Sequence, residues 1–205
     1  MIAFSLAPAY LIQTFGLIGI AAIIFAESGL FIGFFLPGDS LLFMAGAIAA
    51  GVFASLSVSL SLWVLLPTVA VAAIAGDQVG YGFGNRVGPA PFNRPNSRWF
   101  HQEHLQRAQV FFDEHGPKAL VLARFVPIVR TFTPIVAGAS RMSYRSFVTY
   151  NVIGGAVWSL GVVLLGYFFG QVSLVRDHIE IALMGVVAVS LIPIGVEMAK
   201  SRRKA

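Results

Sequence analysis

Four ionisable residues lie inside otherwise apolar segments, and they divide into two acids and two bases. Glu27 and Asp39 belong to "AESGLFIGFFLPGDSLLFMAGAIAAG", and Arg124 and Arg130 belong to "KALVLARFVPIVRTFTPIVAGASRMS". Placing a charge in a membrane-spanning segment costs about 2.5 to 3.5 kcal/mol on insertion scales, so such residues face the protein interior or a wet cavity and pair with one another. We therefore predict that the two carboxylates are partners of the two guanidinium groups.

The two kinds of side chain suit different tasks. A guanidinium group binds phosphate through two parallel hydrogen bonds and stays charged in almost any environment, so Arg124 and Arg130 are predicted to bind an anionic headgroup. A carboxyl group in a low-dielectric environment holds a proton more readily than it does in water. Glu27 and Asp39 are therefore predicted to exchange protons and to couple proton movement to that headgroup site. The alternative is that the four charges only hold two segments together.

A fifth ionisable residue, Asp77, lies in "GDQVGYGFG" near the end of an apolar run. It is predicted either to cap a helix or turn, or to be an accessory member of the charged site. The glycines around it do not form a dinucleotide fingerprint, because no strand precedes them and the G-x-G-x-x-G order is absent.

Enzyme classes fit the sequence poorly. The stretch "HQEHLQRAQ" departs from the zinc motif H-E-x-x-H, and the chain has no cysteine for a thiolate nucleophile or metal site. Ser28 and Ser40 adjoin the two carboxylates, but the apolar runs hold no histidine that could act as a base. We therefore expect a protein that is not an enzyme and that has no catalytic residue, no metal and no cofactor.

The composition is that of an integral membrane protein with one domain, residues 1–205. Hydrophobic residues make up 57% of the chain and charged residues 11%, with a mean hydropathy of +0.81, whereas soluble domains carry about 25% charged residues. A helix needs about 20 residues to cross the hydrocarbon core. The apolar runs that could cross it or enter it deeply lie near residues 10–35, 41–75, 119–139, 146–170 and 179–196.

The basic residues predict orientation. The net charge is +5, but no Lys or Arg precedes Arg86 and the basic residues form no continuous stripe, so cytoplasmic loops explain the surplus better than nucleic acid does. The N-terminus lacks a basic n-region, so the first apolar run is expected to be a retained helix. With both chain ends in the cytoplasm, nearly every basic residue outside the apolar runs is also cytoplasmic, and Arg176 is the exception.

Two apolar runs contain helix breakers. Pro37-Gly38 interrupts the first, and the second leg that follows, about 12 residues, rises about 18 Å, which does not cross a membrane. Pro127 and Pro134 interrupt the second run beside its two arginines. We therefore predict re-entrant hairpins at about residues 31–51 and 118–140.

The expected fold is an all-α polytopic membrane protein, with about four transmembrane helices and the two opposed hairpins in an inverted repeat. Each hairpin opens with Phe-x-Pro and closes with Ala-Gly-Ala, and inverted repeats around broken helices are frequent in secondary transporters. The polar stretch 85–117 is predicted to be a cytoplasmic loop with an amphipathic surface helix, and residues 200–205 are a basic tail.

These motifs together resemble the DedA family, the bacterial branch of the SNARE-associated or VTT-domain membrane proteins. The resemblance covers about residues 15–170 and rests on Glu27, "FLPGD", "GDQVGYGFG", "ARFVPIVRTFTPIVAG" and "NVIGGAVW". It implies a multi-pass protein of the inner (plasma) membrane, linked to the proton-motive force and to moving lipids such as undecaprenyl phosphate or phospholipid. The family's functional charges correspond to Glu27, Asp39, Arg124 and Arg130.

The expected function is therefore translocation of a lipid phosphate, driven by protons. A proton-coupled exporter of small cations or drugs, and a membrane assembly factor that transports nothing, are the alternatives. The identity of the lipid, the proton stoichiometry and direction, and the presence of a homo-oligomer stay open.

Overall fold

The computed structural model describes residues 8–30, 37–53, 58–88, 116–125, 127–172 and 185. These residues form α-helices and one short 3₁₀ helix, and no strand occurs among them, which confirms the expected all-α class. The elements are α1 (Pro8–Gly29), α2 (Gly38–Ala49), α3 (Leu62–Val87), η3 (Gly116–Lys118), α5 (Ala119–Ala123), α6 (Pro127–Ala139) and α7 (Tyr144–Phe169).

Three helices in the described part of the chain, α1, α3 and α7, are long and apolar enough to cross a membrane. The apolar run expected near residues 179–196 and the basic tail lie outside the described residues, apart from residue 185. The same holds for most of the polar stretch 85–117, including its amphipathic helix. Its first residues, however, extend α3 to Val87, where Gly88 with a φ of 61° ends the helix.

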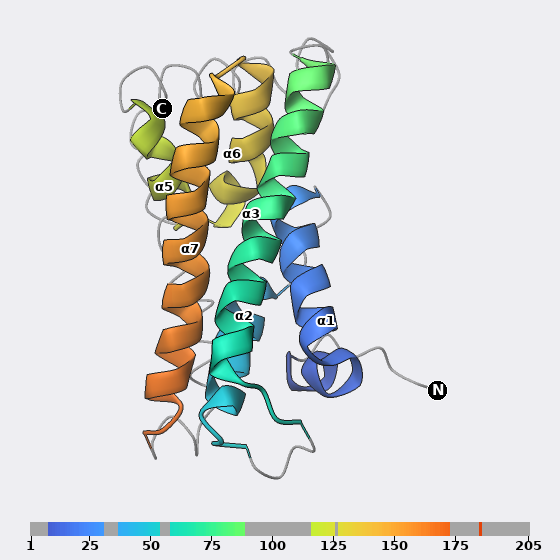
Figure 1. Cartoon of the computed structure of the whole chain (residues 1–205), viewed down its shortest axis with the longest axis vertical. Coiled ribbons are helices and arrows are strands. Elements are labelled where there is room, and N and C mark those ends of the chain that lie inside the picture. The colour runs from blue at the N-terminus through green and yellow to red at the C-terminus, as the bar shows by residue number, and fades with distance from the viewer. Residues whose placement is uncertain are drawn as a thin grey trace, which may run out of the picture.

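The long helices α3 and α7 run in opposite directions along the whole bundle (Figure 1). Helix α1 packs on α3 and helix α2 packs on α7, both in the lower half of the view, whereas α6 packs on α3 and α5 packs on α7 in the upper half. Helices α2 and α6 both begin near mid-height and run to opposite ends (Figure 1). The middle of the bundle is therefore where four helix ends meet the two long helices.

The helix breaks only partly match the expected positions. Helix α2 begins directly after Pro37, as the first break predicts, while residues 31–36 of the expected hairpin lie outside the described residues. In the second segment the break precedes Pro127, which is the first residue of α6. Proline is tolerated there because its missing N–H has no partner in the first turn. The expectation that Pro134 also interrupts the segment is wrong, because α6 continues through it to Ala139.

Close contacts between helices depend on glycine. A Cβ atom on Gly29 would overlap the backbone of Gly76, so α1 and α3 touch through two glycines. A Cβ on Gly46 would overlap the carbonyl of Val163, which brings α2 against α7 in the same way. Such small residues allow membrane helices to approach closely and pack by van der Waals contact.

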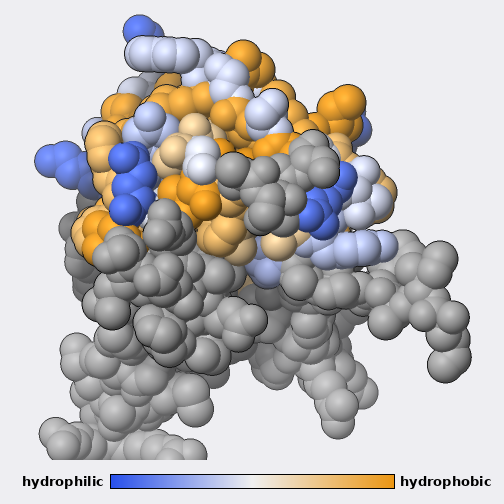
Figure 2. All heavy atoms as spheres, turned by 90° about the horizontal axis from the view of Figure 1, so that it is seen from below, coloured by the Kyte–Doolittle hydropathy of each residue, from blue (hydrophilic) through white to orange (hydrophobic). Residues whose placement is uncertain are grey.

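The two ends of the bundle differ in charge. The described basic residues outside the central segments are Arg86, Lys118, Arg141 and Arg145, and they lie at the upper ends of α3, α6 and α7 or in η3 (Figure 1). No described charged residue lies at the lower end. Figure 2 shows that end, where apolar residues lie among scattered hydrophilic ones.

Candidate functional site

The buried charges gather near the middle of the two long helices. With a rise of about 1.5 Å per residue, Asp77 lies about 22 Å from the first residue of α3 and about 15 Å from its last. By the same measure Trp158 lies about 21 Å from the first residue of α7 and about 16 Å from its last. The site is therefore remote from both ends of the bundle.

Arg130, in the first turn of α6, is the centre of one cluster. Its Nη1 donates a hydrogen bond of 2.8 Å to Asp39 Oδ1, and its Nη2 forms an ion pair with Glu27 Oε1. The indole Nε1 of Trp158 donates a 3.0 Å hydrogen bond to the same Asp39 oxygen, and the guanidinium carbon lies 4.4 Å from the centre of the Trp158 ring. The side chains of Arg130, Glu27 and Asp39 are 9%, 5% and 15% exposed, so water screens these charges little.

The positions of these charges relative to the helix ends favour their pairing. Glu27 lies in the last turn of α1 and Arg130 in the first turn of α6, and each charge is unfavourable with respect to its own helix dipole. Asp39 is favourable in the first turn of α2, and the Glu27 carboxylate lies against Gly38 at the same helix start. The opposite charges offset the two unfavourable placements.

Arg124, directly after α5, forms the second cluster. Its Nη2 forms an ion pair with Asp77 Oδ2 and donates a 2.5 Å hydrogen bond to Asn151 Oδ1. The amide of Asn151 in turn donates a 3.3 Å hydrogen bond to the Ile74 carbonyl. The Arg124 and Asp77 side chains are 8% and 4% exposed. The amide of Asn151 thus bridges the backbone of α3 to the guanidinium group.

Two glycines of α7 make room for the Arg124 side chain. A Cβ atom on Gly154 would lie 3.0 Å from Arg124 Cδ, and one on Gly155 would lie 3.3 Å from Nη2 and 2.9 Å from Ile74 Cγ1. Larger residues would therefore displace the arginine or separate α3 from α7.

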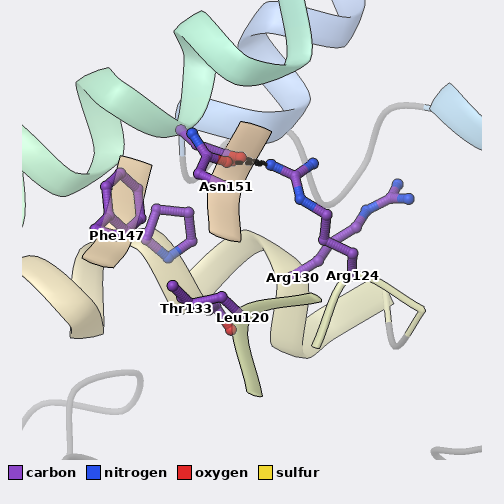
Figure 3. Close-up of a pocket in the computed structure, with 8 residues that line it drawn as sticks. Leu120, Arg124, Arg130, Thr133, Phe147 and Asn151 are labelled. Atoms are coloured by element: carbon purple, nitrogen blue, oxygen red, sulfur yellow. Dashed lines mark hydrogen bonds and ion pairs between the residues drawn. The ribbon is translucent and has the colours of Figure 1, made fainter. Parts of the chain in front are cut away.

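Both guanidinium groups border one small, partly open cavity, which has room for about one water molecule. In Figure 3 Asn151 is joined to Arg124, and Thr133 and Leu120 lie across the cavity from it. The complete lining consists of Asp77, Leu120, Arg124, Arg130, Thr133, Pro134, Phe147 and Asn151.

An aromatic layer lies at the upper side of this cavity. The ring of Phe147, which lines the cavity, stacks on Tyr81 with ring centres 4.3 Å apart. The Tyr81 hydroxyl donates a 2.6 Å hydrogen bond to the Met142 carbonyl, which holds the layer to the connection between α6 and α7. The cavity is therefore lined by charged groups together with an aromatic ring.

Comparison with known proteins places this arrangement in a family. The model of the VTT domain matches residues 36–168. Protein DedA of Escherichia coli strain K12 is 44% identical over 183 residues, which are 89% of this chain and 82% of that protein.

The chain belongs to the DedA family of VTT-domain proteins. An uncharacterized membrane protein of Mycobacterium leprae is 45% identical over 171 residues, covering 83% of this chain and 74% of the relative. The inner membrane protein YghB of Escherichia coli strain K12 is 37% identical over 164 residues, covering 77% and 69%. No solved structure matches the chain.

This DedA-family protein brings together all five charged residues that the sequence singled out, but with a different pairing. Glu27 and Asp39 both bind Arg130, while Arg124 binds Asp77. The interpretation of Asp77 as a cap is wrong, because it lies in the interior of α3.

Two further side chains of this DedA-family protein, Asn151 and Trp158, contact the charges and were missed by sequence reasoning. Trp158 is buried in the core, and it binds Asp39 and Arg130. A signal for both was present in the sequence. An asparagine inside an apolar run needs a hydrogen-bond partner, and residues seven apart lie on the same face of a helix.

Proposed function

We propose that this DedA-family protein moves a lipid with a phosphate headgroup across the cytoplasmic membrane and couples the movement to protons. The observation that carries the proposal is the pair of buried guanidinium groups on one cavity at mid-height, each held by carboxylates. Buried charges at membrane depth are costly, so their presence favours a functional role. A polyprenyl phosphate or a phospholipid has the headgroup chemistry that such arginines bind.

The arrangement of the helices supports opposed re-entrant hairpins related as an inverted repeat. The described helices form two sets of three, α1 to α3 and α5 to α7. In each set the first helix packs on the third, α1 on α3 and α5 on α7. The middle helix packs on the third helix of the other set, α2 on α7 and α6 on α3. The first set supplies the three acids and the second supplies the two arginines. Rocking one set against the other would open the central cavity to one leaflet at a time.

In the proposed cycle the arginines bind the headgroup and the carboxylates that they release take up protons. Ionised, the three carboxylates and two guanidinium groups sum to a charge of −1, so a phosphate cannot enter without protons or a large electrostatic cost. A membrane potential contributes about 2.3 kcal/mol per charge per 100 mV, which can drive such a cycle.

The distribution of basic residues supports an orientation with the upper end, and both chain termini, in the cytoplasm. The relative named as an inner membrane protein supports the same membrane for this chain.

Reconstitution tests the proposal. The full chain is placed in liposomes that contain a trace of undecaprenyl phosphate, and an impermeant phosphatase outside measures how much of the lipid becomes accessible with time. Wild type should make the inner-leaflet lipid accessible when a proton gradient is imposed. Arg130→Gln should slow the rate about tenfold or more, because a charge-assisted contact contributes about 1.5 to 3 kcal/mol. Equal rates for the two proteins, or no transport by wild type, would refute the proposal.

The three carboxylates outnumber the two guanidinium groups by one, and a bound cation would neutralise the remaining negative charge. This favours one other candidate function, a proton-coupled exporter of small organic cations. Competition separates the two functions: a monovalent organic cation should inhibit the exporter, and an alkyl phosphate should inhibit the lipid translocase.

A membrane assembly factor would use the charges only to hold the helices. In that case the double variant Asp39→Arg with Arg130→Asp, which preserves the pair, should retain activity, whereas a transporter should lose it.

A further inference from the structure

The carboxylate of Asp77 forms an ion pair with the guanidinium group of Arg124 at the wall of the cavity. Both side chains line this cavity and both are buried, so the carboxylate takes up one side of the guanidinium group that could otherwise bind a ligand in the cavity. A carboxylate and a phosphate monoester bind the arginine fork in the same bidentate geometry. The protein thus carries, on α3, a group with the recognition chemistry of the headgroup proposed above.

The surroundings of Arg124 hold the arginine in place from the side of α7. Gly154 and Gly155 leave only enough room for its side chain, and Asn151 accepts a hydrogen bond from Nη2 while its own amide donates one to the Ile74 carbonyl. The guanidinium group is therefore oriented by residues other than Asp77. Loss of the Asp77 carboxylate would leave the orientation of Arg124 largely intact.

The charge balance distinguishes Asp77 from the carboxylates on Arg130. Arg130 is shared by Glu27 and Asp39, and Trp158 supplies a further hydrogen bond to Asp39. Asp77 has the single ion-pair partner Arg124 among the described residues. Displacing Asp77 therefore breaks one ion pair, whereas freeing Arg130 requires the movement of two carboxylates.

We infer that the Asp77 carboxylate is an internal occupant of a phosphate-binding site at the Arg124 guanidinium group, and that an entering phosphate monoester displaces it. The inference rests on the proposed function and deepens it, because it assigns Arg124 the first contact with the headgroup and Arg130 the later one. Displaced from its cation in a buried place, Asp77 becomes neutral by taking a proton as the ligand enters. By competing for Arg124, Asp77 thereby lowers the affinity of the site for phosphate.

The test measures binding of decyl phosphate to the purified full chain in a neutral detergent, with decyl phosphocholine as the control ligand. Asp77→Asn should bind decyl phosphate about tenfold more tightly than wild type, because a charge-assisted partner no longer competes. Binding of decyl phosphocholine should stay unchanged. The double variant Asp77→Asn with Arg124→Gln should lose the gain in affinity.

Equal or weaker binding of decyl phosphate by Asp77→Asn, with wild type still binding, would overturn this inference and leave the proposed function standing. Absence of binding in wild type and in both variants would refute the proposed function as well. If Asp77→Asn does not fold, Asp77→Ser is used, and decyl phosphate should raise its thermal unfolding temperature more than that of wild type. An equal rise in the two proteins would overturn the inference.

Discussion

Removal of Arg130 should destabilise the protein far more than removal of its whole cluster. In Arg130→Gln the carboxylates of Glu27 and Asp39 remain buried, with side chains 5% and 15% exposed, and lose their cation. Breaking a buried ion pair from one side costs about 3 to 5 kcal/mol. The triple variant Glu27→Gln, Asp39→Asn, Arg130→Gln leaves no unpaired charge, so its stability should lie within about 2 kcal/mol of wild type.

Thermal unfolding of the purified proteins, followed by circular dichroism in a mild detergent, measures this difference. For a chain of this size about 1 kcal/mol corresponds to about 2 to 4 °C, so Arg130→Gln should unfold roughly 6 to 20 °C below wild type. The triple variant should unfold much closer to wild type and yet be inactive in transport. A triple variant as unstable as Arg130→Gln would show that the cluster mainly holds the helices together. Retained transport by the triple variant would refute a functional role for it.

Three more substitutions test the packing around the site, with Gly161→Ala as a shared control because a Cβ there meets nothing within 4 Å. Gly155→Ala places a Cβ 3.3 Å from Arg124 Nη2 and 2.9 Å from Ile74 Cγ1, so transport should fall several-fold and the unfolding temperature should fall below that of the control; unchanged transport would contradict the assigned position of the arginine. Gly46→Ala forces α2 away from α7 and should cost about 1 to 3 kcal/mol of stability, measured by thermal unfolding, whereas an effect no larger than the control's would refute the close contact. Trp158→Phe keeps an aromatic ring beside the arginine of α6 but removes a 3.0 Å hydrogen bond, so stability should fall by about 1 kcal/mol, and a stability equal to wild type would show that the bond contributes nothing.

Much of the fold follows from local features of the chain. The break at Pro37-Gly38 could be read directly, since proline removes a backbone donor and clashes with the preceding turn, and α2 begins directly after it. Pro134 was misread for the same reason, because a proline within a membrane helix can be accommodated when neighbouring groups satisfy the backbone. Whether a proline ends a helix thus depends on what packs against it.

The partners of the charges could not be predicted in the same way. Sequence reasoning identified the acids and bases but joined Arg124 to the wrong carboxylates, and it treated Asp77 as a cap or an accessory residue. The partner of a buried charge is decided by the depth and rotation of each helix. Those depend on contacts such as that between Gly29 and Gly76, which lie on different helices.

The sequence by itself determined that this is an α-helical membrane protein of the DedA family with buried acids and arginines. The membrane class and the buried charges follow from hydropathy, helix breakers and the cost of burying a charge, and the family follows from the resemblance of its motifs; all of these are properties of short segments. Only the tertiary structure decided that two carboxylates pair with Arg130 and that Asp77 pairs with Arg124. It also decided that Asn151 and Trp158 form hydrogen bonds with these charged groups. The physical reason is that ion pairs and hydrogen bonds act over a few ångströms, and the approach of segments distant in sequence is set by the packing of whole helices.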